Sequence, residues 1–219
     1  MSRSTLAALV LAVAASPVHG QSAGGGQSGP RSLLPRDREI ALARSAAPAS
    51  VADSATVFAL TARGYEVAVR GSNGAACYVS RDWLESIEPH CFDAEGAATV
   101  MALAMRRIEL LHQGKTPAEA DREIADGLVT GRFRLPRRPA MSYMLSAAQV
   151  LYDDDGRRVG PWQPHLMIYY PYLTAADLGL PAGAGAPGLM VVDAGRPTAN
   201  IMVVVREFVQ PRLPEPAGR

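Results

Sequence analysis

The hydrophobic period of the sequence changes twice, and this order of patterns is what most constrains the fold. Alternating residues such as Tyr65, Val67 and Val69 predict half-buried strands over residues 56–79. Apolar residues at helical spacing follow over residues 93–130, and strand patterns return from residue 149 onward. Strands, then helices, then strands, joined by short turns, predict an α+β fold with a mainly antiparallel sheet and a helical pair packed on one face.

The helical pair has clear start and stop signals. Asp93 suits a helix N-cap and Gly114 a C-terminal stop. Thr116, Pro117 and Glu119 then combine a capping box with proline at the first helical position, which predicts a second helix running to about residue 130. A shorter helix is expected over residues 37–47.

The strand segments are bounded by turn signals. Asn73-Gly74 predicts a hairpin turn, so the first three strands should form an antiparallel meander. Residues 83–92 are expected to be irregular. A second hairpin is predicted at Asp155-Gly156, and further strands are expected over residues 165–170, 189–192 and 201–208.

The N-terminus has the pattern of a secretory signal peptide. Residues 1–20 combine Arg3, an apolar run from Leu6 to Ala15, and small residues before Gln21. We therefore expect export to the periplasm or beyond the cell. A flexible leader over residues 21–36, a single α+β domain over 37–210 and a loose tail over 211–219 complete the predicted organisation.

Charge and hydropathy argue against nucleic-acid binding and against a membrane-spanning helix after the signal peptide. Lys and Arg together number 22 against 21 Asp and Glu, so the chain lacks the basic excess of a nucleic-acid-binding protein. No segment after the signal peptide approaches the run of about 18 apolar residues that a membrane helix needs. No motif for a cofactor is found either.

Cys77 and Cys91 are the two cysteines of the chain. In an oxidising compartment an isolated pair at this spacing is best explained by a disulfide. A redox pair, or a metal site that includes His90, is the alternative reading of the same residues.

The most suggestive segment for function is WQPHLMIYYP (residues 162–171). If it forms a strand, His165, Met167 and Tyr169 share one face. Together with the nearby Tyr143, these residues are the candidate ligand-binding site. A histidine that is packed at the edge of the core and hydrogen-bonded to backbone is the alternative.

Two other functions remain open at the same place. Ser142 with His165 would supply the nucleophile and the base of a hydrolase, although no nucleophile elbow or acidic partner is found. Met141, Met144 and Met167 with His165 would supply soft ligands for copper, and zinc is a further alternative.

The segments PAMSYMLS (residues 139–146) and WQPHLMIYYP resemble uncharacterised exported bacterial proteins, as do residues 40–48 and 71–74. The similarity covers most of residues 37–175. This resemblance implies no known activity, and it directs attention to Ser142, Tyr143 and His165.

Overall fold

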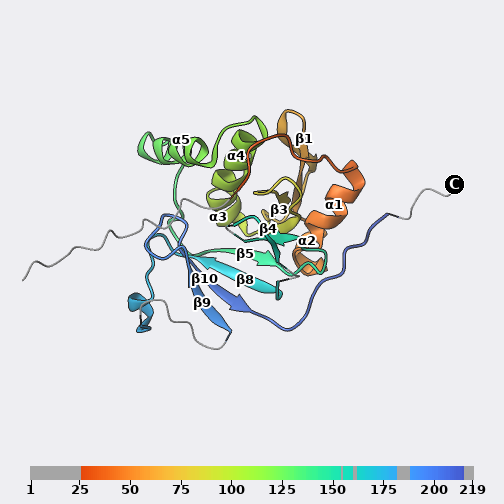
Figure 1. Ribbon diagram of the computed structural model, residues 1–219. Coiled ribbons are helices and arrows are strands. Elements are labelled where there is room, and N and C mark those ends of the chain that lie inside the picture. Colours follow the sequence, from red (N-terminus) through yellow and green to blue (C-terminus); the bar gives the residue numbers. More distant parts are fainter. Residues whose placement is uncertain (1–25, 154, 160–161, 182–187, 215–219) are drawn as a thin grey trace, which may run out of the picture.

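An eight-stranded mixed sheet forms the centre of the protein (Figure 1). A computed structural model describes residues 26–153, 155–159, 162–181 and 188–214. The predicted signal peptide, residues 1–20, lies outside the described residues. The strands run in the order β2-β1-β3-β4-β5-β8-β10-β9. Their bounds are β1 Thr56–Thr61, β2 Gly64–Val69, β3 Ala76–Ser80, β4 Glu88–Phe92, β5 Ala140–Met144, β8 His165–Tyr169, β9 Leu189–Val192 and β10 Asn200–Val204.

The first three strands correct the predicted meander. β1 and β2 form an antiparallel hairpin, but β3 pairs in parallel with β1 on its other side. The segment around Asn73 therefore carries the chain past the start of β1 and does not close a hairpin. The Asn73 side chain fixes this path, because its Nδ2 donates to Val51 O at 2.8 Å and its Oδ1 accepts from Ala75 N at 3.0 Å.

A strand at residues 88–92 replaces the irregular segment that was predicted there. β4 pairs antiparallel with β3, and its last two residues also pair with β5. Pro89 argues against an inner strand because proline lacks an N–H group. On the β5 side, only Cys91 and Phe92 are paired. Pro89 lies outside this pairing, so its missing N–H group breaks no hydrogen bond to β5.

The predicted helical pair is confirmed as α4 (Val100–His112) and α5 (Pro117–Val129). Thr116 and Glu119 form the complete capping box at the start of α5. Asp93 also acts as an N-cap, since it accepts from Gly96 N at 2.7 Å. It caps a separate turn, α3 (Ala94–Ala97), because the backbone of Thr99 leaves the helical region before α4 begins.

Helices cover both faces of the first half of the sheet. α1 (Arg36–Arg44) and α2 (Ala49–Ala52) pack through small residues on the face that carries Val57, Cys77 and Val79. α4 packs on the opposite face against Tyr78 and Phe92, and α5 packs on α4 through Ala120. Figure 1 shows α4 and α5 on one side of β1 and β3, and α1 and α2 on the other side. No helix among the described residues is long and apolar enough to cross a membrane.

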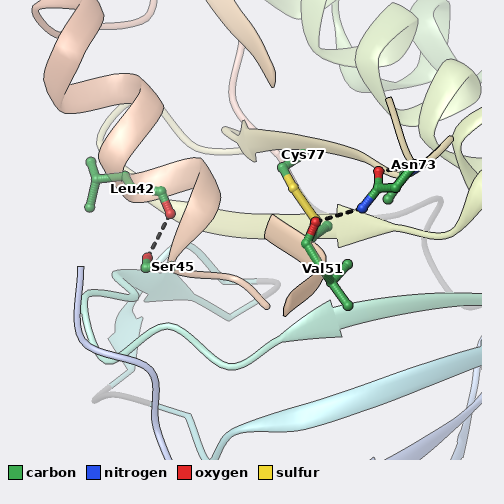
Figure 2. The surroundings of a disulfide bond; sticks show 7 residues. Leu42, Ser45, Val51, Asn73 and Cys77 are labelled. Carbon is green, nitrogen blue, oxygen red and sulfur yellow. Dashed lines mark hydrogen bonds between the residues drawn. A yellow bond between two sulfur atoms is a disulfide. The ribbon is translucent and has the colours of Figure 1, made fainter. Parts of the chain in front are cut away.

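The predicted disulfide is present. Cys77 and Cys91 are opposite each other on β3 and β4, fourteen positions apart in the chain, and both are fully buried. Figure 2 shows the bond between the strands and the two short helices, close to the Asn73–Val51 hydrogen bond. The bond lies on the face of the sheet against which α1 and α2 pack.

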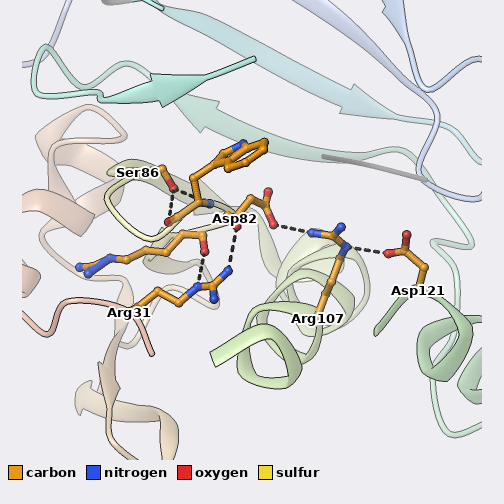
Figure 3. Close-up of polar contacts among 7 residues, drawn as sticks. Arg31, Asp82, Ser86, Arg107 and Asp121 are labelled. Carbon is orange, nitrogen blue, oxygen red and sulfur yellow. Dashed lines mark hydrogen bonds and ion pairs between the residues drawn. The ribbon is translucent and has the colours of Figure 1, made fainter. Parts of the chain in front are cut away.

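The segment before α1 differs from the predicted flexible leader where it is described, from residue 26. Arg31 is 3% exposed, and its guanidinium donates to Arg81 O and Asp82 O, as Figure 3 shows. Gly29 N also donates to Leu111 O at 2.9 Å. The buried arginine supplies hydrogen bonds that a Gly- and Ser-rich composition does not reveal.

The C-terminal half contains one further hairpin and a shorter last strand than predicted. β6 (Leu151–Tyr152) and β7 (Arg158–Val159) form the hairpin expected at Asp155-Gly156, and a 3₁₀ turn, η1, spans Ala176–Leu178. β10 ends at Val204, although the apolar pattern predicts a strand to residue 208. Residues 211–214 of the predicted loose tail have no helix or strand.

Candidate functional site

A cleft of about 840 Å³ lies between the α4–α5 pair and the second half of the sheet. Its floor comes from strands β3, β4, β5, β8 and β10, its wall from α4 and α5, and its rim from loops around residues 82 and 193–198. The floor residues are Tyr78, His90, Phe92, Met144, His165, Met167, Tyr169, Asn200 and Met202. The wall residues are Leu103, Ala104, Arg107, Asp121, Ile124, Ala125 and Leu128.

Strand register explains why the floor residues converge. Alternate residues of a strand point to the same face, and paired residues of neighbouring strands lie side by side. Met144 of β5 pairs with His165 of β8, and Met167 of β8 pairs with Met202 of the next strand, β10. The sequence pattern predicts that His165, Met167 and Tyr169 share a face, and all three line the cleft.

His165 is 2% exposed, and both of its ring nitrogens contact protein atoms. Nδ1 lies 2.7 Å from Gln163 O and Nε2 lies 3.1 Å from Met144 Sδ. Burial lowers the pKa of His165, and the hydrogen bond to Gln163 O opposes this effect. The ring is therefore a buried part of the cleft floor, held at a fixed angle by the backbone.

Two other floor residues carry buried polar atoms that have no hydrogen-bond partner among the described residues. His90 Nδ1 and Asn200 Oδ1 are such atoms, and the residues are 9% and 1% exposed. Burial, with a contribution from His165, lowers the pKa of His90 to about 3, so its ring is neutral at neutral pH. Leaving such a group unpaired costs about 1–3 kcal/mol, which a ligand could recover.

Ser142 does not contact His165 through its hydrogen bonds. Its hydroxyl is fully buried and lies 3.4 Å from Tyr169 Oη, which is also 3.4 Å from Met167 Sδ. Burial raises the pKa of Tyr169 to about 12. The hydroxyl of Ser142 is thus directed to a neutral phenol, and the His165 ring to Gln163 and Met144.

Tyr143 and Met141 lie away from the cleft. Along β5, Ala140, Ser142 and Met144 face one side of the sheet, so Met141 and Tyr143 face the other. Tyr143 packs against the buried cluster that contains the disulfide. The structure therefore does not bring Tyr143 or Met141 together with His165.

The rim of the cleft carries charged groups that are paired with each other. Arg107 of α4 contacts the carboxylates of Asp82 and Asp121, each at 2.7 Å (Figure 3). Glu88 lies deeper, and burial, with a smaller contribution from the charge of Asp82, raises its pKa to about 8. At neutral pH its carboxyl is therefore mostly protonated, and the interior of the cleft carries little charge.

Metal ligands of the usual type do not cluster. Among the described residues, no group of three or more His, Cys, Asp and Glu side chains is placed to hold a metal ion. Methionine sulfur is a typical ligand of copper and not of zinc, so this absence bears on zinc more than on copper. The cysteine–His90 metal reading does not apply, because both thiols are in the disulfide.

The comparisons with known proteins add no family. No protein-family model, curated protein or solved structure matches the chain. The resemblance to exported bacterial proteins therefore stays a prediction.

Sequence reasoning did not identify His90 or Asn200 as part of the site. His90 was considered only with Cys91, whereas its ring lines the cleft from β4. Asn200 is the first residue of β10, and it lies just before the apolar run that predicts this strand. The antiparallel register that joins both residues to His165 is a tertiary property, and a single sequence holds no signal for it.

Proposed function

We propose that the protein binds a small, neutral and largely apolar organic molecule in the cleft, with a site that includes His165, Met167 and Tyr169. The observation that carries this proposal is a cavity of about 840 Å³ with an aromatic and methionine floor, in which His90 and Asn200 each carry a buried polar atom without a hydrogen-bond partner among the described residues. Apolar pockets with a few convergent polar groups are the usual form of small-molecule sites.

The polar groups define the class of ligand. Asn200 Oδ1 can only accept a hydrogen bond, so the ligand should carry a hydroxyl or an N–H group. His90 is neutral and Glu88 is mostly protonated at neutral pH. A charged organic ligand would lose its hydration there without gaining a counter-charge, which favours a neutral organic molecule.

Binding without catalysis fits the positions of the candidate catalytic residues better than hydrolysis does. Ser142 is fully buried and is not a lining residue of the cleft. A serine nucleophile must reach a substrate and contact its general base. The hydroxyl of Ser142 instead lies beside Tyr169.

Export belongs to the same proposal. The signal pattern of residues 1–20 supports it, as does a disulfide of the kind that persists in oxidising compartments. Protein recovered from the periplasm or medium should begin near Gln21, and a cytoplasmic chain that retains residues 1–20 would contradict export.

The test uses the neutral fluorescent amine N-phenyl-1-naphthylamine, which is apolar and carries one N–H group. We expect its fluorescence to rise when it binds the protein. Ala125→Trp places a bulky ring at the cleft wall from an exposed position of α5, and it should weaken binding about 10-fold or more.

Ala118→Trp is the matched control, because Ala118 is an exposed residue of the same helix outside the cleft lining. Asn200→Leu should weaken binding about 10-fold, as expected for one lost hydrogen bond. Equal affinities of the Ala125→Trp and Ala118→Trp proteins, or no binding of the probe by the unaltered protein, would contradict the proposal.

A further inference from the structure

A row of soft donor groups crosses the floor of the cleft. Met144 of β5 pairs with His165 of β8. On the other side of β5, Cys91 pairs with Tyr143 and Phe92 with Ser142, and the next residue of each strand beyond this pairing is His90 and Met144. His90, Met144 and His165 all line the cleft, from three neighbouring strands.

One ring nitrogen of His165, Nε2, contacts a group that cannot donate a proton to it. A carbonyl oxygen only accepts, so the 2.7 Å contact with Gln163 O requires a proton on Nδ1. In a neutral ring Nε2 then presents a lone pair, and it faces a thioether sulfur, itself an electron-pair donor, at 3.1 Å. Two electron-pair donors this close together are placed to bind the same cation, which would lie beside the contact and coordinate both atoms.

The orientation of the histidine is also that of a metal ligand. Metal-binding histidines usually donate their other ring N–H to a carbonyl or carboxylate, which fixes the ring and raises the basicity of the ligating nitrogen. Gln163 O is such an acceptor for His165. His90 adds a second imidazole in the same row, and its Nδ1 is buried without a partner among the described residues.

We propose that His90, Met144 and His165 form a binding site for a soft monovalent cation, Cu(I). Thioether sulfur selects Cu(I) over harder metals, and imidazole also suits copper. The absence of a cluster of three His, Cys, Asp or Glu side chains among the described residues disfavours Zn(II). The site does not depend on an organic ligand in the cleft.

This ligand set differs from the one that the sequence suggests. Met141 is on the opposite face of β5, and Met167 accepts a hydrogen bond from Tyr169 Oη. His90, from a strand that was not predicted, takes their place.

The proposal is tested by competition for Cu(I) between the purified protein and the chromophoric chelator bicinchoninate, with ascorbate present. We expect the protein to withdraw one equivalent of Cu(I). Met144→Leu keeps the side-chain volume and should weaken Cu(I) binding at least 100-fold, and His165→Gln should do the same.

Met141→Leu is the matched control, since it removes a thioether from the same strand on the opposite face. It should leave the affinity for Cu(I) unchanged. Methyl NMR of the unaltered protein gives a second readout that does not depend on the folding of a variant. The Met144 methyl signal should shift on addition of Ag(I), a redox-inert analogue, while that of Met141 stays in place.

Three results would overturn the proposal: no withdrawal of Cu(I) from the chelator, equal affinities of the Met144→Leu and Met141→Leu proteins, or displacement of Cu(I) by an equal concentration of Zn(II).

Discussion

The two halves of the sheet are covered in different ways. In the first half, β2-β1-β3-β4, α1 and α2 close one face and α4 closes the other, and every residue of β3 is buried. In the second half, β5-β8-β10-β9, the same face lies open and forms most of the floor of the cleft, together with Tyr78, His90 and Phe92 of β3 and β4. The outer strand β9 has no buried residue.

This difference separates stability from binding within one sheet. The first half contains the disulfide and the buried Glu39–Arg81 ion pair, and its core is lined by small residues that allow close packing. The second half, with His90 of the adjoining β4, supplies the apolar and unpaired polar residues that line the cleft. Changes in the first half away from the cleft should therefore alter unfolding, and changes in the cleft floor should alter binding.

The largest effect is expected from the buried ion pair. Glu39 is 1% exposed and Arg81 2% exposed, and Arg81 also donates to Ser32 O at 2.7 Å. Burial raises the pKa of Glu39, and the charge of Arg81 opposes this effect. Glu39→Ala leaves a buried guanidinium without its partner, so the free energy of unfolding should fall by about 3–5 kcal/mol in guanidinium titrations.

The control is the exposed pair Arg63–Glu66, in which the Arg63 side chain is 84% exposed. Glu66→Ala should cost less than about 1 kcal/mol. Similar losses in the Glu39→Ala and Glu66→Ala proteins would show that the first half does not depend on the buried pair.

Removal of the disulfide should have the next largest effect. The Cys77→Ala/Cys91→Ala protein should lose about 3 kcal/mol, as expected for a closed loop of this length. Its affinity for N-phenyl-1-naphthylamine should stay unchanged, because the bond lies on the face opposite the cleft. A large loss of affinity for the probe in protein that remains folded would show that the disulfide also supports the binding site.

The smallest effect is expected where the halves meet. Glu95 of α3 accepts from Arg137 N at 3.1 Å and from Arg134 at 2.9 Å, and so holds the segment that leads into β5. The hydrogen bonds from Arg137 N and Arg134 lower the pKa of Glu95, so the folded state favours its ionised form.

The stability contributed by Glu95 is therefore present above the pKa of the unfolded chain, about 4.3, and is lost as the pH falls through the lower folded value. The Glu95→Gln protein should lose less stability than the unaltered protein between pH 5 and pH 3, measured by thermal unfolding. Glu207→Gln, at an exposed site, is the control. If the Glu95→Gln and unaltered proteins lost the same stability between pH 5 and pH 3, the ionised Glu95 would not hold the segment that leads into β5.

The local features of the fold could be predicted from sequence because their signals are local. The capping box at Thr116, the N-cap at Asp93 and the alternation from Tyr65 to Val69 each involve only neighbouring residues. The disulfide followed from the presence of a single pair of cysteines. These features are enough to define the α+β class and the position of the helical pair.

Features that depend on distant parts of the chain were missed. The parallel pairing of β3 with β1 joins strands that are not consecutive in the chain, and β4 contains Pro89, which disfavours an inner strand. The candidate site follows the same rule. The shared face of His165, Met167 and Tyr169 could be predicted, whereas His90 and Asn200 join them only through the sheet order.

The position of the disulfide within the sheet also bears on how the protein is built. It links neighbouring strands near the centre, and the later strands of this sheet all lie on the outer side of β4, in the spatial order β5, β8, β10 and β9. The wall helices α4 and α5 precede β5 in the chain. The cross-linked strands and the wall of the cleft therefore come from one continuous part of the chain, and the strands that complete the floor, β5, β8 and β10, all follow it.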